Sequence, residues 1–348
     1  MANLFFLISG EYETLSFSEL KAILEAEGYE YTVKEKLDQV ARIETDVASI
    51  VQIKRRSAYT RICAQELFTS EATDEAIIGA AESTNFRDIL KEGETFQVRI
   101  RRIREYSIKD DTMRLERKLG RHILENATGA YVNLKTPVKT FFGVLTDHKL
   151  VFGLRLAEIQ PKPFVERRPR KKPFFHPSAM NAKLARCMVN LAHAKTGKTV
   201  LDPFCGTGTT ILEATLIGCK AIGADVQRRM AEGTRKNLKK FGVEAEAVLL
   251  ADARKLPFTR IDAVVTDPPY GKSATTLKST TKLLVENVLS SAKPLLRRGQ
   301  RICIASPKTL QVAKLGGAAG YEHLESHYAY VHRTLTREIA VFRKESEE

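Results

Sequence analysis

The sequence predicts an α/β protein with a mostly parallel sheet in its C-terminal half and α+β units before it. In the C-terminal half, short apolar runs alternate with helical stretches, as is typical of parallel strands buried on both faces. One of these runs leads through a glycine turn into a helix, at residues 200–217. In the N-terminal half, strand-like and helix-like stretches alternate from the start of the chain. The 348 residues suffice for two or three domains with separate cores.

The first element is an apolar strand at residues 4–8, followed by a helix whose apolar residues fall within 20–26. Ser16 or Ser18 can cap this helix. Strand and helix then alternate again, and we expect a ferredoxin-like α+β domain over residues 1–54.

A more basic unit follows over residues 55–158. Its strand at 96–103 alternates apolar and basic residues, which predicts one core face and one cationic face. Arg99, Arg101 and Arg102 on that strand are candidates for binding RNA phosphates, and a solvated charged face is the alternative. A helix near 113–124 and strands near 130–134 and 140–154 complete the unit.

Prolines separate basic residues in the next segment, 159–176, which we interpret as an extended and stiffened linker. Its basic residues either contact an RNA backbone or form a solvated surface. These candidates are Arg167, Arg168, Arg170, Lys171 and Lys172.

The remaining residues, 177–348, begin with an amphipathic helix after Pro177. Helices are expected around residue 210 and over 229–241 and 282–296, and alternating runs at 327–331 and 336–342 predict a final hairpin. The expected parallel strands lie at 199–201, 221–224, 247–250, 261–265 and 301–305.

The glycine turn in this region is a nucleotide-type loop. Gly206 and Gly208 permit a tight turn and close approach of a ligand, and Thr209 can cap the following helix. The third glycine of a dinucleotide fingerprint is replaced by Ile211, which disfavours NAD. S-adenosylmethionine (SAM) has no pyrophosphate and fits such a loop.

Two aspartates follow the next apolar runs. Asp225 lies about 20 residues beyond the loop, where an acid can bind both ribose hydroxyls. Asp252 follows the run at 248–251 and can accept a hydrogen bond from an adenine amino group. Alternatively, either one is a strand-end or helix-capping residue.

The most informative segment is TDPPYG, residues 266–271. The Asp267 side chain and the Pro268 carbonyl can accept the two N–H groups of an exocyclic amine, which draws its lone pair out of the ring plane. Tyr270 offers a face on which an extruded base stacks, a contact of ~1–3 kcal/mol. Pro268 and Pro269 stiffen the segment. The alternative is a Pro-Pro turn after a buried strand.

The order of these motifs resembles the Rossmann-like SAM-dependent amino-methyltransferases. TDPPYG followed by Lys272-Ser273, and preceded by Phe-His-Pro-Ser-Ala-Met at 175–180 and a basic N-terminal region, resembles the archaeal tRNA guanine-10 N2-methyltransferases. That resemblance implies a seven-stranded methyltransferase domain over 177–348. It also implies a THUMP domain over 55–158 that docks on tRNA.

The resemblance also implies the residues of the site. Asp267, Pro268, Pro269 and Tyr270 would be catalytic. Lys272 can contact RNA near the flipped base, and a polar active-site lid is the alternative. His176 and Pro177 would lie near the methionine part of SAM. The other expected cofactor-binding residues are Asp202, Phe204, Cys205, Gly206, Thr207, Gly208, Thr209, Asp225, Val226, Asp252 and Ala253.

We therefore expect SAM-dependent methylation of guanine N2 in tRNA at position 10, once or twice, with the base flipped out. The alternatives are another tRNA guanine such as position 6, an rRNA guanine, or an RNA-binding THUMP protein with an inactive methyltransferase domain. A DNA substrate is not expected, because the chain ends soon after the hairpin without a recognition domain.

Composition agrees with a polyanionic partner, since 56 Lys and Arg against 42 acids give a net charge of +14. The five cysteines show no metal-binding spacing, so we expect no metal and buried, reduced thiols in a cytoplasmic protein. No apolar run approaches a membrane span. The resemblance leaves open a small zinc-binding activator subunit, which some members of the wider family use.

Overall fold

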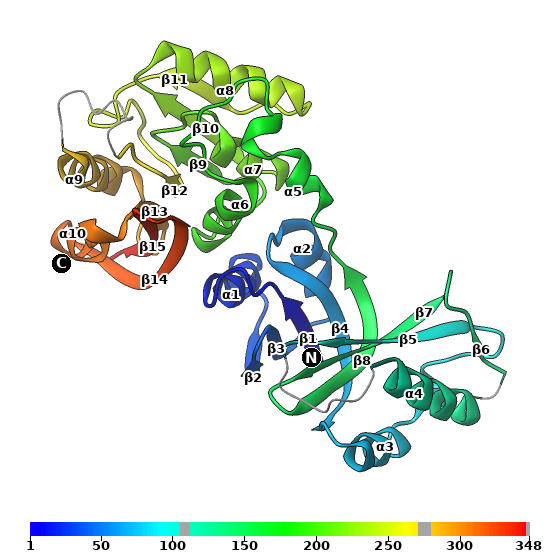
Figure 1. The fold of residues 1–348 in the computed structure, drawn as a ribbon. Helices are drawn as coiled ribbons and strands as arrows, with labels where there is room; N and C mark the ends of the chain where they lie inside the picture. The colour runs from blue at the N-terminus through cyan, green and yellow to red at the C-terminus, as the bar shows by residue number, and fades with distance from the viewer. Residues whose placement is uncertain (105–111, 128, 271–279, 346–348) are drawn as a thin grey trace. The chain divides into compact units, whose positions relative to one another are not determined.

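The structure is a computed structural model that describes residues 1–104, 112–127, 129–270 and 280–345. The chain forms two compact units (Figure 1). The N-terminal unit comprises Met1–Glu11, Tyr29–Lys54 and Thr60–Gln160. The C-terminal unit comprises Pro161–Glu348 together with two earlier segments, Tyr12–Gly28 and Arg55–Tyr59.

A single eight-stranded sheet forms the N-terminal unit, in the order β2-β3-β1-β4-β8-β7-β5-β6. Its strands are β1 (Ala2–Ile8), β2 (Tyr31–Leu37), β3 (Val40–Thr45), β4 (Thr60–Glu71), β5 (Thr95–Arg102), β6 (Tyr131–Val132), β7 (Lys139–Thr146) and β8 (Lys149–Glu158). Its helices include α2 (Ser49–Arg56), α3 (Asp74–Glu82) and α4 (Thr112–Asn126). Strands from both expected N-terminal domains share this sheet, and the boundary at residues 54 and 55 stays a prediction.

Helices α3 and α4 cover one face of this sheet over β5, β7 and β8 (Figure 1). Leu115, Leu119 and Ile123 recur at helical spacing on α4 and pack against Phe141 and Phe152 of the sheet. The expected helix near 113–124 and the strands within 140–154 are confirmed by α4, β7 and β8.

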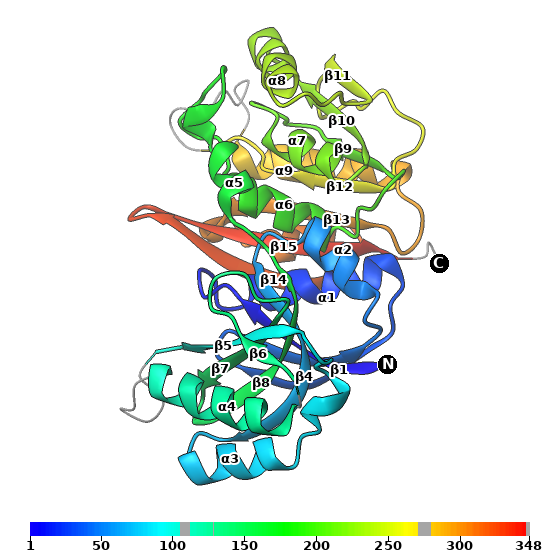
Figure 2. The same ribbon diagram turned by 90° about the vertical axis from the view of Figure 1, so that its right-hand side faces the viewer.

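The C-terminal unit contains the expected seven-stranded sheet, in the order β11-β10-β9-β12-β13-β15-β14. Its strands are β9 (Thr199–Asp202), β10 (Lys220–Asp225), β11 (Ala247–Leu250), β12 (Ala263–Thr266), β13 (Arg301–Pro307), β14 (Tyr321–His332) and β15 (Leu335–Lys344). Strands β9 to β13 run parallel, and β14 and β15 form the expected antiparallel hairpin. Figure 2 shows this hairpin projecting beyond the other strands of its sheet.

Helices cover both faces of the seven-stranded sheet. One face packs against α6 (Ala182–Leu191), α7 (Thr209–Leu216) and α8 (Arg228–Lys240), and the other against α9 (Thr281–Ala292) and α10 (Val312–Ala318). The central strands are therefore buried on both sides, which explains their continuous apolar sequences. The parallel arrangement brings the carboxyl ends of β9, β10 and β12 to one edge.

Helix α1 (Leu15–Glu27) belongs to the C-terminal unit and packs with α6. Its Glu19 is fully buried and accepts hydrogen bonds from the Ser57 hydroxyl, from the backbone N–H groups of Ala58 and Tyr59, and from the Asn190 amide. Residues 12–28 and 55–59 are thereby fixed to α6 and form part of the core of this unit.

The expected caps of α1 are wrong. The helix begins after Thr14, and Ser16 and Ser18 lie buried within its first turn. Ser18 donates a hydrogen bond to Glu325 of β14 instead of capping. Tertiary packing therefore decided where this helix begins.

The expected extended linker is wrong in part. It contains α5 (Lys162–Glu166) and a 3₁₀ turn at Pro169–Lys171, and Phe164 of α5 is buried. The guanidinium groups of Arg167 and Arg186 lie over the Phe164 ring, which ties this segment to α6.

No helix in the described ranges is long and apolar enough to cross a membrane. All five cysteines are free and buried, as expected.

Candidate active site

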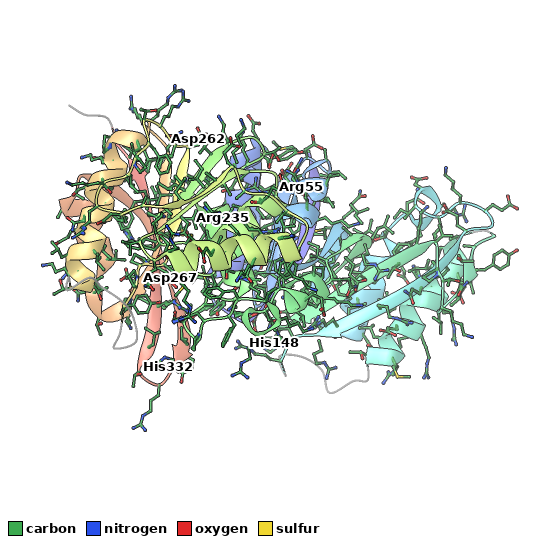
Figure 3. All side chains as sticks on the ribbon, turned by 90° about the horizontal axis from the view of Figure 1, so that it is seen from above. Arg55, His148, Arg235, Asp262, Asp267 and His332 are labelled. Carbon is green, nitrogen blue, oxygen red and sulfur yellow. The ribbon has the colours of Figure 1, made fainter. Side chains whose placement is uncertain are left out.

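A cavity of about 820 Å³ opens at the carboxyl ends of the parallel strands of the C-terminal unit. Ligands bind at this edge in open α/β sheets, and the volume falls within the range of small-molecule sites. The cavity is lined by the glycine loop, by the ends of β10, β11 and β12, and by the β14–β15 hairpin. Figure 3 labels Asp267 and His332, which both line it.

The glycine loop is held by backbone geometry and by one neighbouring side chain. Gly206 and Gly208 adopt φ of 52° and 74°, a region that favours glycine. A Cβ at Gly208 would lie 2.6 Å from the Thr234 Cγ2 atom of α8. The Thr234 hydroxyl donates to the Gly206 carbonyl at 2.9 Å. The loop therefore needs glycine both for its turn and for its close packing on α8.

Asp225 ends β10 and lines the cavity. Its carboxylate accepts the backbone N–H groups of Gly206 at 3.0 Å and Gln227 at 2.8 Å, which links the glycine loop to the start of α8. Each carboxylate oxygen keeps a second lone pair for a ligand hydroxyl. Burial raises the pKa of Asp225, and these two hydrogen bonds oppose that rise. The residue thus fits both the ribose-binding interpretation and the strand-end alternative.

Asp252 also lines the cavity, but its carboxylate is already engaged. Arg254 donates to both oxygens, from Nε at 3.0 Å and 2.9 Å and from Nη2. This pairing lowers the pKa of Asp252. A ligand amino group would have to share or replace the Arg254 contact.

A second cavity, of about 90 Å³, lies beside the glycine loop and includes Asp202 and Asp267 in its lining. Asp202 is buried, and its Oδ1 accepts from the Thr266 hydroxyl at 2.8 Å and from the Phe204 N–H at 3.1 Å. Burial raises the pKa of Asp202 to about 7. Asp267 lines both cavities, so it lies at their junction.

The segment 267–270 follows β12 directly, and we call it the DPPY segment. Asp267 Oδ2 lies 3.1 Å from Nη2 of Arg337 on β15, and the Arg337 Nε donates to the Tyr270 hydroxyl. Burial raises the pKa of Asp267, and the charge of Arg337 opposes that rise. A carboxylate, a phenol ring and a buried guanidinium thus meet at one side of the cavity.

The expected catalytic and cofactor-binding residues gather around these two cavities. The larger one is lined by His176, Pro177, Phe204, Gly206, Asp225, Val226, Asp252, Ala253, Asp267, Pro268, Pro269 and Tyr270. The smaller one adds Asp202, Cys205, Thr207 and Thr209. Gly208 shapes the turn instead of lining a cavity.

Thr209 does not cap α7, so that expectation is wrong. Gly208 is the N-cap residue, and the Thr209 hydroxyl accepts a hydrogen bond from Lys172 at 2.6 Å. Cys205, expected to bind the cofactor, lines the smaller cavity and is buried beside Thr234.

The expected RNA-binding residues are distributed differently. Arg99, Arg101 and Arg102 lie on β5 of the N-terminal unit, where Arg101 is exposed and Phe96, Val98 and Ile100 of the same strand are buried. In the expected linker, Arg168, Arg170 and Lys171 are exposed. Lys272, together with Ser273, lies outside the described residues.

Arg167 and Lys172 point into the C-terminal unit. Arg167 Nε lies 2.6 Å from the fully buried Glu213 carboxylate, and Lys172 is only 5% exposed. Burial lowers the pKa of Lys172 to about 8. The basic sequence of this segment does not distinguish Arg167 and Lys172 from its exposed basic residues, because only tertiary packing determines which of them are buried.

Several lining residues were missed by the sequence analysis. Arg337 is 135 positions from the start of the glycine loop at Asp202 and carries no local motif. The alternating pattern of its strand was visible, but nothing in that pattern indicates a contribution to the site. Other missed residues are Gln227, Arg229, Met230, Arg254, Leu284, Pro307, Val331, His332, Thr334 and Leu335.

The chain was compared with known proteins. A family model described as an RMKL-like methyltransferase domain matches residues 169–338, and one described as a DNA methylase matches residues 71–236. The tRNA (guanine(10)-N2)-dimethyltransferase of Methanothermobacter thermautotrophicus is 37% identical over 97% of this chain and 98% of its own. The protein of the same name from Methanocaldococcus jannaschii is 30% identical over 97% of this chain and 99% of its own.

Among solved structures, TrmN from Thermus thermophilus aligns with a TM-score of 0.55 at 22% identity, covering 98% of this chain and 99% of that one. A possible methylase from Clostridium difficile aligns with a TM-score of 0.56 at 14% identity, covering 100% and 99%. At these identities the likeness shows the fold.

The seven-stranded sheet, the glycine loop and the cavity at its strand ends define a SAM-dependent methyltransferase. Its similarity to two curated relatives extends over nearly the whole chain. The chain belongs to the tRNA (guanine(10)-N2)-dimethyltransferase family.

Proposed function

We propose that this protein methylates N2 of guanine 10 in tRNA, adding one or two methyl groups. One observation carries the proposal: the DPPY segment and the glycine loop border the same cavity. The substrate is supported by the names of two relatives that each match 97% of the chain.

The residues around the cavities suit the cofactor. Asp225 would hold the ribose, residues near Asp252 would meet the adenine, and the glycine loop with His176 would enclose the methionine part. SAM supplies an electrophilic methyl group. The chain's main contribution is orientation, which can account for up to ~7–11 kcal/mol of the barrier.

The DPPY segment would receive the flipped base. The Asp267 carboxylate and the Pro268 carbonyl accept the amino N–H groups, and Asp267 takes the proton released after methylation. Tyr270 provides the stacking surface. Extrusion of a paired base costs a few kcal/mol, which backbone contacts to a basic protein offset.

We infer that the N-terminal unit binds tRNA as a THUMP-containing module, with the domain boundaries expected from the sequence. Exposed Arg101 on β5 supports this role. The exposed Arg168, Arg170 and Lys171 near the start of the C-terminal unit would add contacts to the RNA backbone from that unit. Such an enzyme would work in the cytoplasm on its tRNA substrates.

The test is methyl transfer from labelled SAM to unmodified tRNA transcripts, with the modified nucleotide mapped by mass spectrometry. We expect N2-methylguanosine or N2,N2-dimethylguanosine at position 10, and no label on a transcript with adenine at that position. An rRNA fragment and a DNA duplex serve as substrate controls.

Label at guanine 6, in rRNA or in DNA would contradict the proposed substrate but would still support the proposed methyl-transfer reaction. SAM binding without transfer to any of these, and with tRNA bound, would favour an RNA-binding protein. Activity that appears only with a small zinc-binding partner would add an activator subunit.

A further inference from the structure

Arg337 is a buried cation next to the DPPY segment. It is 7% exposed, and its Nη2 lies 3.1 Å from Asp267 Oδ2. Its Nε donates to the Tyr270 hydroxyl, and its guanidinium carbon lies 5.7 Å from the centre of the Tyr270 ring. One side chain from β15 therefore contacts two residues that would meet the base.

The two oxygens of Asp267 have different surroundings. Oδ2 pairs with Arg337, whereas Oδ1 is buried and finds no hydrogen-bond partner within residues 1–104, 112–127, 129–270 and 280–345. An unpaired buried acceptor is costly and calls for a specific cause. Because Asp267 lines both cavities, a ligand N–H can supply the missing partner.

The charges around Asp267 explain why a cation is needed there. Burial raises the pKa of Asp267, which disfavours the carboxylate form that accepts N–H bonds. Asp202 also faces Asp267 and shares the smaller cavity, and burial raises the pKa of Tyr270 so that its phenol stays neutral. Arg337 opposes the effect of burial by its positive charge.

We propose that Arg337 is a positioning residue for methyl transfer. It keeps the Asp267 carboxylate ionised and oriented, leaves Oδ1 for the substrate amino group, and holds the Tyr270 ring in place. This inference rests on the proposed function and extends it to a strand outside the sequence motifs. The guanidinium fork suits it to two partners at once, whereas lysine offers a point charge.

The first test is the pH dependence of single-turnover methyl transfer to tRNA at saturating SAM. Arg337→Met should raise the acid limb of the profile by at least ~1 pH unit, because a neighbouring arginine lowers a carboxyl pKa by about 1–3 units. Arg337→Lys should keep the acid limb within about 0.5 units while lowering the plateau rate, since it keeps the charge and loses the bond to Tyr270.

Arg343→Met is the matched control. Arg343 lies on the same strand, is exposed and pairs with Glu322, so its profile should equal that of the wild type. An Arg337→Met profile with an unmoved acid limb, or with an equal loss at every pH, would overturn the proposal. Arg337→Gln carries the same expectation where the methionine variant fails to fold.

A second measurement needs no RNA. In protein labelled with ¹³C-aspartate, the Asp267 carboxyl signal, identified by its loss in Asp267→Asn, should titrate at higher pH in Arg337→Met than in wild type. An unchanged titration would reject the role of Arg337. Wild type that methylates no tRNA, together with a shifted titration, would instead reject the proposed function alone.

Discussion

Two carboxylates of the C-terminal unit, the fully buried Glu19 of α1 and the partly buried Asp267 after β12, have opposite hydrogen-bond arrangements. Both oxygens of Glu19 are occupied, by the Ser57 hydroxyl, the Asn190 amide and the N–H groups of Ala58 and Tyr59. Asp267 has one oxygen paired with Arg337 and one without a partner in the described part of the chain.

We infer that this difference separates a structural acid from the proposed catalytic one. Glu19 is fully buried and both of its oxygens accept hydrogen bonds, so its function is to fasten residues 12–28 and 55–59 to α6. Asp267 lies where two cavities meet, and its spare acceptor has a use only when a ligand arrives. Burial raises the pKa of both, so the shift alone does not distinguish them.

The largest expected effect on stability follows from Glu19→Ala. Removing this carboxylate leaves several buried donors unpaired, at about 1–3 kcal/mol each, so we expect a loss of at least ~3 kcal/mol in the free energy of unfolding. Urea unfolding measures it. Glu25→Ala on the same helix, which removes an exposed carboxylate paired with the partly buried His193 and Arg301, should cost clearly less than Glu19→Ala. Equal losses in the two variants would contradict the structural role.

Asp267→Ala should act on turnover instead. Loss of a group aimed at the reacting amine typically lowers the rate by ~10²–10³-fold, or about 3–4 kcal/mol. Its unfolding free energy should fall less than that of Glu19→Ala, because cavity water can solvate the Arg337 left behind. Methyl-transfer rates, tRNA affinity and urea unfolding test this together.

Asp267→Asn is the matched control, since its amide oxygen still accepts one N–H. It should retain more activity than Asp267→Ala while binding tRNA equally well. If Asp267→Ala turned over at the wild-type rate, Asp267 would not be the acceptor for the amino N–H groups of the substrate.

Asp202 is a third carboxylate for this comparison and, like Glu19, it is buried. Its pKa of about 7 lies above the ordinary value of 3.8, so the folded protein binds an extra proton between these pH values. The free energy of unfolding should therefore fall as pH rises from about 4 to about 7, by ~2–4 kcal/mol, at about 1.4 kcal/mol per pKa unit.

Asp202→Asn should lack most of that pH dependence. Its Oδ1 can still accept from Thr266 and Phe204, both of which bond this one oxygen in the native protein. Denaturation at pH 5 and pH 8 without SAM provides the test. The same pH slope in both proteins would show that Asp202 is not the responsible group.

The smallest expected effect concerns the N-terminal unit, where charge is exposed. Arg101→Ala on β5 should weaken tRNA binding a few-fold and reduce the salt dependence of the binding constant by about one unit of slope. Lys34→Ala on β2, at the opposite end of the same sheet, should change neither quantity. Filter binding across a salt series measures both variants. If Arg101→Ala and Lys34→Ala had the same tRNA affinity and salt dependence, β5 would not be part of the RNA-binding surface.

Local sequence patterns predicted much of the C-terminal unit. The continuous apolar runs marked β9 to β13, and the two alternating runs marked β14 and β15. Glycines with positive φ and a proline pair are local requirements, so the glycine loop and the DPPY segment were visible as candidates before any contact was known. The residue types suited to a methyl-transfer site therefore came from the chain alone.

Tertiary structure decided what those patterns leave open. A serine near the start of a helix can cap the helix or be buried within it, and Ser18 is buried and donates to Glu325. A basic residue can extend into solvent or pair with a buried acid, and Arg167 pairs with Glu213. Arg337 joins Asp267 and Tyr270 only because β15 pairs with β13 in the folded sheet. Local propensity depends on a few neighbouring residues, whereas burial and charge pairing depend on partners far away in sequence, and only the folded chain brings them together.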